Sequence, residues 1–304
     1  MKEAERSILL TDPHARPVGG GAGSRFFAQA LSQWYRHAPG RVAAVSAPAM
    51  LRRGEYFAIL MGPEWWKCLP YFSIADKKSF YIFDAWPHTH EAILAFVERF
   101  HVERVFVSSS EATSMLGAVG PPTTFVWCPE AIDPTVYTAK SIGEKDIDVL
   151  HLGRRYDWYH HQIRDALQTA GRRYYFERDR GVIIFPSRAQ FIDGLARSKV
   201  SICVPASISH PGRAEGLETM TLRYLQSMVA KCLIVGHAPA EIVTLFRYNP
   251  VVEIARSDPG RQLVAILDNY EQYLPLIQRN YETVRAEHTW SQRWASIRAE
   301  LRRP

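Results

Sequence analysis

Cysteine is scarce in this 304-residue sequence, and its spacing excludes two classes of protein. The four cysteines, Cys68, Cys128, Cys203 and Cys232, are far apart and form no C-x-x-C pair. Zinc ribbons need paired ligands at short spacing, and disulfide frameworks need many cysteines in a short chain. We therefore expect buried thiols in a reducing compartment and place the protein in the cytoplasm.

Long hydrophobic runs are also missing. No stretch approaches 18 consecutive apolar residues, so no transmembrane helix is expected. The first 12 residues carry acidic side chains and only a very short apolar run, so no signal peptide is expected either.

Several nucleotide- and nucleic-acid-binding signatures are absent. The glycine-rich segment 17–24 (PVGGGAGS) does not match G-x-G-x-x-G, because Ser24 stands at the third glycine position, and no G-K-[ST] follows it. This argues against a dehydrogenase, while another two-domain enzyme such as a sugar-nucleotide epimerase stays an alternative. Without a zinc finger, a Lys/Arg run or an aromatic–basic platform, no nucleic-acid partner is expected.

Positive charge is concentrated in the second half of the chain. The net charge is +6, and residues 141–304 carry 23 Lys+Arg against 18 Asp+Glu. A basic half suits an anionic ligand such as a nucleoside diphosphate. It also suits peripheral contact with an anionic membrane, and an arginine-rich genome would give the same excess.

Short apolar runs alternate with amphipathic segments, which is typical of parallel α/β folds. The expected strands are 7–11, 42–46, 56–61, 79–83, 104–108, 124–127, 146–152, 173–176, 181–185, 200–204 and 231–236. The expected helices are 25–37, 91–100, 159–170, 189–198, 221–230, 260–269 and 273–301, the last interrupted near Pro275. The pattern occurs twice, and the polar stretch 138–146 suits a linker, so we expect domains at 1–140 and 141–304.

Two glycine-containing loops follow predicted strands, where ligands of α/β proteins bind. Gly19, Gly20 and Gly21 lie between the first predicted strand and the first predicted helix. They could form a loop that contacts an acceptor, or they could be a simple flexible turn. Gly153 and Arg154 follow the first strand of the second half. An arginine there could clamp a phosphate through two parallel hydrogen bonds, or it could be an exposed loop residue.

The most informative segment is 210–236 (HPGRAEGLETMTLRYLQSMVAKCLIVG), a polar loop that leads into a helix and a buried strand. Glu218 and Gln226 are separated by seven residues, and Arg223 precedes Gln226 by three. This resembles the donor-site segment of group 1 glycosyltransferases, which carries two glutamates at that spacing. The arginine is similar to one in the CgeB-like branch of the family. Gln226 in place of the second glutamate is a departure.

The resemblance implies a role for each matching residue. Glu218 would lie near the transferred sugar and Gln226 near the ribose, where a neutral amide binds more weakly than a carboxylate. Thr219 and Thr221 would meet the phosphates. Gly153, Arg154 and Arg223 would complete the donor site, the arginines stabilising charge on the leaving diphosphate.

The resemblance extends over most of the chain and implies the GT-B architecture. Trp127 to Pro134 (WCPEAIDP) resembles the end of the family's acceptor domain, and 288–294 (HTWSQRW) resembles its closing helix. The implied fold is two Rossmann-like domains facing a cleft, with the C-terminal helix crossing back to the first. The implied reaction transfers a sugar from a nucleoside diphosphate sugar to a glycan, lipid-linked or small-molecule acceptor. It would retain the anomeric configuration without a metal or a tightly bound cofactor. A binding or regulatory protein that lost catalysis is the alternative.

Acidic and histidine residues outside this segment give weaker signals. Asp84 and His88 follow a predicted strand of the first half, which favours a catalytic role in a cleft for one or both of them. The resemblance implies that a histidine of the acceptor domain is close to the sugar. The D-x-D pair Asp146 and Asp148 enters an apolar strand, so we do not expect it to bind a metal. His88 and His90 lack the third ligand that a metal site needs.

Overall fold

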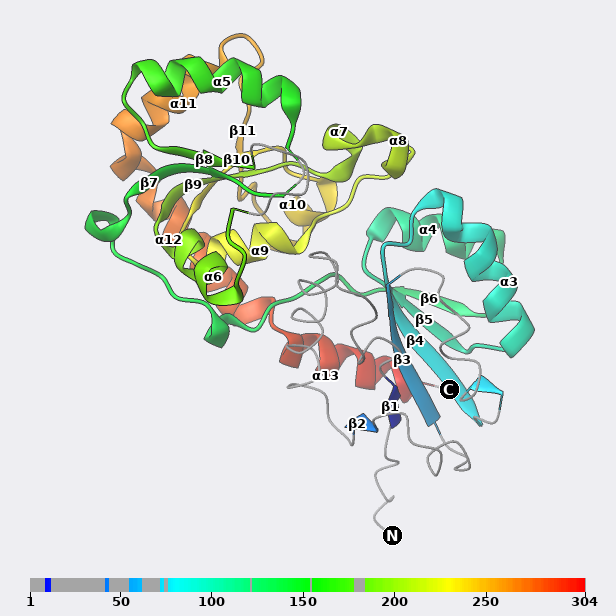
Figure 1. Cartoon of the computed structure of the whole chain (residues 1–304). Coiled ribbons are helices and arrows are strands. Elements are labelled where there is room, and N and C mark those ends of the chain that lie inside the picture. Colours follow the sequence, from blue (N-terminus) through cyan, green and yellow to red (C-terminus); the bar gives the residue numbers. More distant parts are fainter. Residues whose placement is uncertain are drawn as a thin grey trace. The chain divides into compact units, whose positions relative to one another are not determined.

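The structure is a computed structural model that describes residues 9–11, 42–43, 55–61, 72–73, 76–120, 122–153, 155–177 and 184–303. The chain divides into two compact units, Met1–Pro129 with Trp290–Pro304, and Glu130–Thr289. Each contains a sheet whose strands pair in parallel (Figure 1). The predicted α/β class with two Rossmann-like domains is therefore confirmed. The division falls after Pro129 rather than after residue 140.

The first unit is built on a sheet with strand order β2-β1-β3-β4-β5-β6. The strands are β1 (Leu9–Thr11), β2 (Val42–Ala43), β3 (Glu55–Met61), β4 (Lys77–Phe83), β5 (Arg104–Val107) and β6 (Thr124–Trp127). The described helices before the C-terminal segment are η3 (Pro87–Thr89), α3 (His90–Phe100) and α4 (Ser110–Val119). Phe57 and Ile59 of β3 are fully buried, and so is Ala58 between them. Both faces of the sheet are thus covered, which explains the continuous apolar strands.

The C-terminal helix belongs to the first unit. The predicted helix 273–301 is in fact two helices, α12 (Leu274–Glu287) and α13 (Trp290–Leu301). The break lies at His288 and Thr289. Pro275 lies in the first turn of α12, where no backbone N–H is needed, so it starts the helix instead of interrupting it. Trp294 of α13 packs 5.2 Å from the Phe57 ring, which confirms the expected return to the first domain.

The second unit has the strand order β11-β10-β9-β7-β8. Its strands are β7 (Ile147–His151), β8 (Tyr174–Phe176), β9 (Ser198–Cys203), β10 (Leu233–Gly236) and β11 (Val252–Glu253). Its helices are η4 (Pro134–Val136), η5 (Ile142–Glu144), α5 (Asp157–Thr169), α6 (Arg188–Ala196), α7 (Ala206–Ser209), α8 (Pro211–Ala214), α9 (Leu222–Val229), α10 (Ala240–Phe246), α11 (Pro259–Asp268), η6 (Tyr270–Tyr273) and α12. The chain order reverses between β7 and β9, which makes their carboxyl ends the topological switch point.

Alternating side chains of the second sheet pack against different helices. Val200 and Ile202 of β9 lie in one buried cluster with residues of α5 and α11. Cys203 of the same strand lies in another cluster with residues of α9 and α10. The two-residue period of a strand therefore assigns one pair of helices to each face.

The polar stretch 138–146 is part of the second unit. Lys145 is buried, and its ammonium donates to the carbonyl oxygens of Ala196, Ser198 and Ala230 at 2.9, 2.8 and 3.0 Å. Burial lowers the pKa of this ammonium. All three N–H groups of the ammonium donate to carbonyl oxygens near the ends of α6 and α9. The stretch 138–146 is therefore bound to the second unit and is not a free linker.

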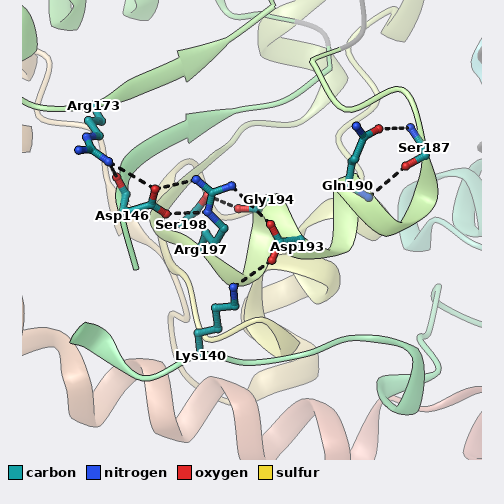
Figure 2. Close-up of polar contacts among 9 residues, drawn as sticks. All are labelled: Lys140, Asp146, Arg173, Ser187, Gln190, Asp193, Gly194, Arg197 and Ser198. Carbon is teal, nitrogen blue, oxygen red and sulfur yellow. Dashed lines mark hydrogen bonds and ion pairs between the residues drawn. The ribbon is translucent and has the colours of Figure 1, made fainter. Parts of the chain in front are cut away.

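The D-x-D pair is used for ion pairs at the amino end of β7. Figure 2 shows Arg197 donating to both carboxylate oxygens of Asp146, at 2.7 and 2.6 Å, with Arg173 beside them. Asp148 accepts from the Lys199 ammonium at 2.7 Å. These ion pairs give both carboxylates basic partners within the second unit.

Some expected elements differ or lie outside the described residues. The predicted strand 181–185 is described only at Ile184 and Phe185, which are not in a strand. They pack against a buried cluster that includes Leu195 instead. The short elements α10 and β11 were not predicted. The expected helix 25–37 lies outside the described residues. In the part of the chain that the structure describes, every helix is too short or too polar to span a bilayer.

Candidate functional site

Most of the predicted site residues of the second unit gather at the carboxyl edge of its sheet. Gly153 follows β7, and Glu218, Thr219 and Thr221 lie in the connection from β9 to α9. Arg223 is in the first turn of α9. This edge is the switch point of the sheet, where open α/β sheets bind ligands. Arg154 lies outside the described residues.

Gly153 and Arg223 are in direct contact. Gly153 has a left-handed backbone, with φ at 70°, and a Cβ on it would overlap the Arg223 guanidinium and lie 3.2 Å from its Cζ. Arg223 makes no hydrogen bond or ion pair with any residue that the structure describes. Because Gly153 has no side chain, the Arg223 guanidinium fits at the switch point. Its N–H groups are available to an anion.

A Gly153→Ala variant should displace the Arg223 side chain while leaving the fold intact, because a flexible side chain can move. The φ strain should cost about 1 kcal/mol of unfolding free energy. Gly171→Ala is the matched control, since Gly171 has φ at 65° and nothing within 4 Å of its added Cβ. We expect equal unfolding midpoints in urea for the two variants but weakened nucleotide binding only in Gly153→Ala. Equal nucleotide affinities in Gly153→Ala and Gly171→Ala would contradict a role for the Gly153–Arg223 contact in nucleotide binding.

The start of α9 offers unused hydrogen-bonding groups. Thr221 is the N-cap residue with an extended backbone, but its side chain makes no cap hydrogen bond. Its hydroxyl oxygen is buried without a hydrogen-bond partner among the described residues. The first N–H groups of a helix and the positive end of its dipole favour an anion. The predicted place of Thr221 at the helix start is therefore confirmed, while its contact with phosphate stays a prediction.

The loop before α9 is held by residues that follow β10. Glu218 accepts from the Ala240 backbone N–H at 3.3 Å and contacts the His237 ring at 3.2 Å. Glu241, which is 5% exposed, accepts from the Thr219 hydroxyl at 2.8 Å and from the Met220 backbone N–H. His237 and Glu241 were not predicted from the sequence, where their only signal is that they follow the strand after the motif.

Gln226 does not join the other predicted residues. It is 4% exposed, and its Nε2 donates to the Tyr137 hydroxyl at 3.0 Å. This bond ties α9 to the segment that precedes β7. The ribose role of Gln226 stays a prediction, and the described geometry adds no support to it.

Glu177 is a further charged residue of this edge that the sequence analysis missed. It directly follows β8, and burial raises the pKa of its carboxyl group, although the Gly153 N–H and the Arg223 charge act in the opposite direction. Its backbone carbonyl accepts from Arg155 at 3.1 Å. The carboxylate therefore shares the surroundings of Gly153 and Arg223.

Two buried histidines lie directly behind the edge. The Tyr156 backbone N–H donates to His151 Nε2 at 3.4 Å, so the proton of the neutral ring is on Nδ1. That nitrogen lies 3.2 Å from the Tyr174 hydroxyl, which lies 3.0 Å from His160 Nδ1. Burial is the main cause that lowers the pKa of His151 to about 3 and that of His160 to about 4. His160 lies in the first turn of α5, yet it is a core residue, 4% exposed.

This histidine pair predicts loss of stability in acid. Below about pH 6.5 the unfolded histidines take up protons that the folded unit resists, so the unfolding free energy falls until the folded pKa values of about 3 and 4 are reached. Each histidine contributes up to about 1.4 kcal/mol per pH unit. Urea unfolding from pH 7 to 4.5 should show a shallower fall for His160→Gln than for the exposed control His161→Gln. Equal slopes would refute the assignment.

In the first unit, Asp84 and His88 follow β4 as expected. Asp84 has a positive φ of 42°, unusual for a residue other than glycine, and such strain is often found at functional sites. His88 is exposed in η3. His90 Nε2 contacts the Ala85 carbonyl at 3.0 Å, and no metal-binding group of three His, Cys, Asp or Glu occurs in the described ranges. The acceptor-side loop Gly19, Gly20 and Gly21 lies outside those ranges.

No family model matches the sequence. No curated protein matches it either.

Solved structures do match the fold. Anabaena HepE in complex with UDP and glucose has a TM-score of 0.59 at 11% identity, over 98% of this chain and 99% of HepE. Sucrose-phosphate synthase from Thermosynechococcus elongatus has a TM-score of 0.57 at 10% identity, over 98% of each chain. TarM has a TM-score of 0.59 at 10% identity over 82% of this chain, which spans only 55% of TarM. The chain therefore has the two Rossmann-like domains of the GT-B glycosyltransferase fold.

Proposed function

We propose that the protein is a glycosyltransferase that takes its sugar from a nucleoside diphosphate sugar. The observation that carries the proposal is Arg223, a cation that makes no hydrogen bond or ion pair with a described residue and contacts Gly153 at the switch point. The fold adds support, because structures with the same fold were solved with UDP or UDP-glucose bound. We therefore propose UDP as the first nucleotide to test.

The diphosphate is proposed to bind at the start of α9. Arg223 would donate to the phosphate oxygens, and the Thr221 hydroxyl and the first N–H groups of α9 would add neutral donors. The Thr219 hydroxyl donates to Glu241, so it would have to turn away from that carboxylate to meet the phosphates. Arg154 would complete the site from the loop after β7. These groups would stabilise the negative charge that develops on the leaving diphosphate, which is the main catalytic effect that we propose.

Glu218 is proposed to contact the transferred sugar. Both of its oxygens are already held by His237 and Ala240, so the carboxylate has a fixed orientation. The resemblance to group 1 glycosyltransferases, including the CgeB-like branch, supports a retaining reaction without a metal. In this proposal no cofactor is tightly bound.

The first unit is proposed to bind the acceptor, which is a glycan, a lipid-linked sugar or a small molecule. Asp84 and His88 are the residues that would approach the sugar from this unit. Replacing each with alanine and comparing donor hydrolysis with transfer would separate an acceptor role from a donor role. Peripheral membrane contact belongs to the same proposal, because it would suit a lipid-linked acceptor.

Calorimetric titration with UDP, GDP, ADP and NAD, with and without magnesium, tests the proposed function. We expect one nucleoside diphosphate to bind, with the same affinity with and without magnesium, and NAD not to bind. Tight binding of NAD alone would instead indicate a dehydrogenase. A failure of all four ligands to bind would refute the donor site.

Gln226 favours a second candidate, a binding or regulatory protein with this fold. The amide that replaces the family's second glutamate is buried and bonded to Tyr137. Ribose binding would then be weak, and turnover would be lost. Measurable donor hydrolysis or sugar transfer would exclude this candidate.

A further inference from the structure

The strongest unassigned cluster of the second unit is a histidine held between two carboxylates. His237 directly follows β10, and its Nε2 lies 3.2 Å from Glu218 Oε2 while its Nδ1 lies 3.2 Å from Glu253 Oε2. Glu218 comes from the connection after β9, and Glu253 is the last residue of β11. The imidazole therefore links three neighbouring segments at the carboxyl edge of the sheet.

The backbone of His237 is fixed on both sides. Its N–H donates to the Cys203 carbonyl at 3.1 Å, and its carbonyl accepts from the Tyr224 hydroxyl at 2.6 Å. These two hydrogen bonds fix the backbone from which the imidazole ring extends, between β9 and α9. Its direction is set by Glu253, whose other oxygen accepts from the Ala238 N–H at 2.9 Å.

We propose that His237, oriented by Glu253, is a positioning residue that fixes the Glu218 carboxylate for contact with the donor sugar. This inference rests on the proposed function, because it needs Glu218 to face the sugar. The Ala240 N–H holds Oε1 of Glu218 and the His237 ring holds Oε2, so the carboxylate keeps one orientation. The Glu218 side chain is still 26% exposed, so it can be reached from outside the unit.

A fixed carboxylate binds a sugar hydroxyl without first losing side-chain freedom. His237 and Glu253 would therefore affect the sugar and not the nucleotide. The nucleotide is assigned to Arg223 and the start of α9, where the Tyr224 hydroxyl bonds the backbone carbonyl of His237, a group that His237→Ala keeps. This separation distinguishes positioning from a general structural role, because a damaged fold would weaken the binding of both parts of the donor.

The test compares the affinities of UDP and UDP-glucose in wild-type protein, His237→Ala, Glu253→Gln and the exposed control His161→Ala. We expect UDP to bind all four within about twofold, while UDP-glucose loses about tenfold in His237→Ala, which is typical of one hydrogen bond to a charged group. Glu253→Gln should lose less, since the amide can still accept from the ring. His161→Ala should match the wild type.

A second measurement shows whether His237 acts through Glu218. In a Glu218→Gln background, the His237→Ala change should have no further effect on UDP-glucose affinity, because contacting residues are not additive. An unchanged UDP-glucose affinity in His237→Ala, an equal loss of UDP affinity, or full additivity would each overturn the inference. Equal affinity of wild-type protein for UDP and UDP-glucose would also overturn it. Absence of any nucleotide binding by the wild type would overturn the proposed function and the inference together.

Discussion

Replacing Arg223 with alanine is expected to weaken UDP binding by roughly tenfold to a hundredfold, the range for losing charge-assisted hydrogen bonds. The physical reason is that this guanidinium makes no ion pair or hydrogen bond within the described part of the chain, so its donors are available to the diphosphate. It also lies against Gly153, which has no side chain to shield it. Calorimetric titration of UDP measures the loss.

Two further variants sharpen this prediction. Arg223→Lys keeps the charge but loses the planar fork, so it should recover only part of the affinity. Arg164→Ala removes an exposed arginine of α5 that pairs with Asp165, and it should bind UDP as the wild type does. If Arg223→Ala binds UDP normally, the phosphate role of this residue is wrong and the diphosphate site must be sought elsewhere.

The largest effect on stability is expected for Gly236→Ala. Gly236 ends β10, and a Cβ there would overlap the carbonyl oxygen of Cys203 and lie 2.6 Å from its carbonyl carbon. Backbone atoms of the neighbouring strand β9 cannot move aside as a side chain can. The two strands would have to separate at the edge that carries the candidate site, at a cost of about 3 kcal/mol or more.

Urea unfolding monitored by circular dichroism measures this effect. Gly212→Ala is the matched control, because nothing lies within 4 Å of its added Cβ and the residue lies in the short helix α8 of the same unit. We expect little change in its unfolding midpoint. Comparable midpoints for the two variants would show that β9 and β10 do not approach each other as closely as described.

The sequence predicted much of the fold because buried parallel strands are continuous apolar runs. The expected strands 56–61 and 231–236 correspond closely to β3 and β10. The short elements α10 and β11 could not be recognised, since two to seven residues contain too little periodicity. His288 and Thr289 divide the last helix, and because neither is a glycine or proline, no helix-breaking residue marks that point.

The candidate site was predicted mainly where the residues are close together in the sequence, and Gly153 is the exception. The segment from Glu218 to Arg223 surrounds the start of α9, and its composition alone placed a polar loop before a helix and a buried strand. His237 and Glu241 follow β10 and Glu177 follows β8, and this position after a strand is the only feature of their local sequence that distinguishes them.

The sequence by itself determined the α/β class, the two repeats of the pattern and the polar loop at the start of α9, because strand burial and helix periodicity are local properties. Only the tertiary structure decided which side chains are available at that loop. Strand order places Gly153 against Arg223 and His237 against Glu218, although 69 and 18 residues separate the members of these pairs in the sequence. It also buries Gln226 against Tyr137. Burial and hydrogen bonding depend on these long-range neighbours, and a local pattern does not contain them.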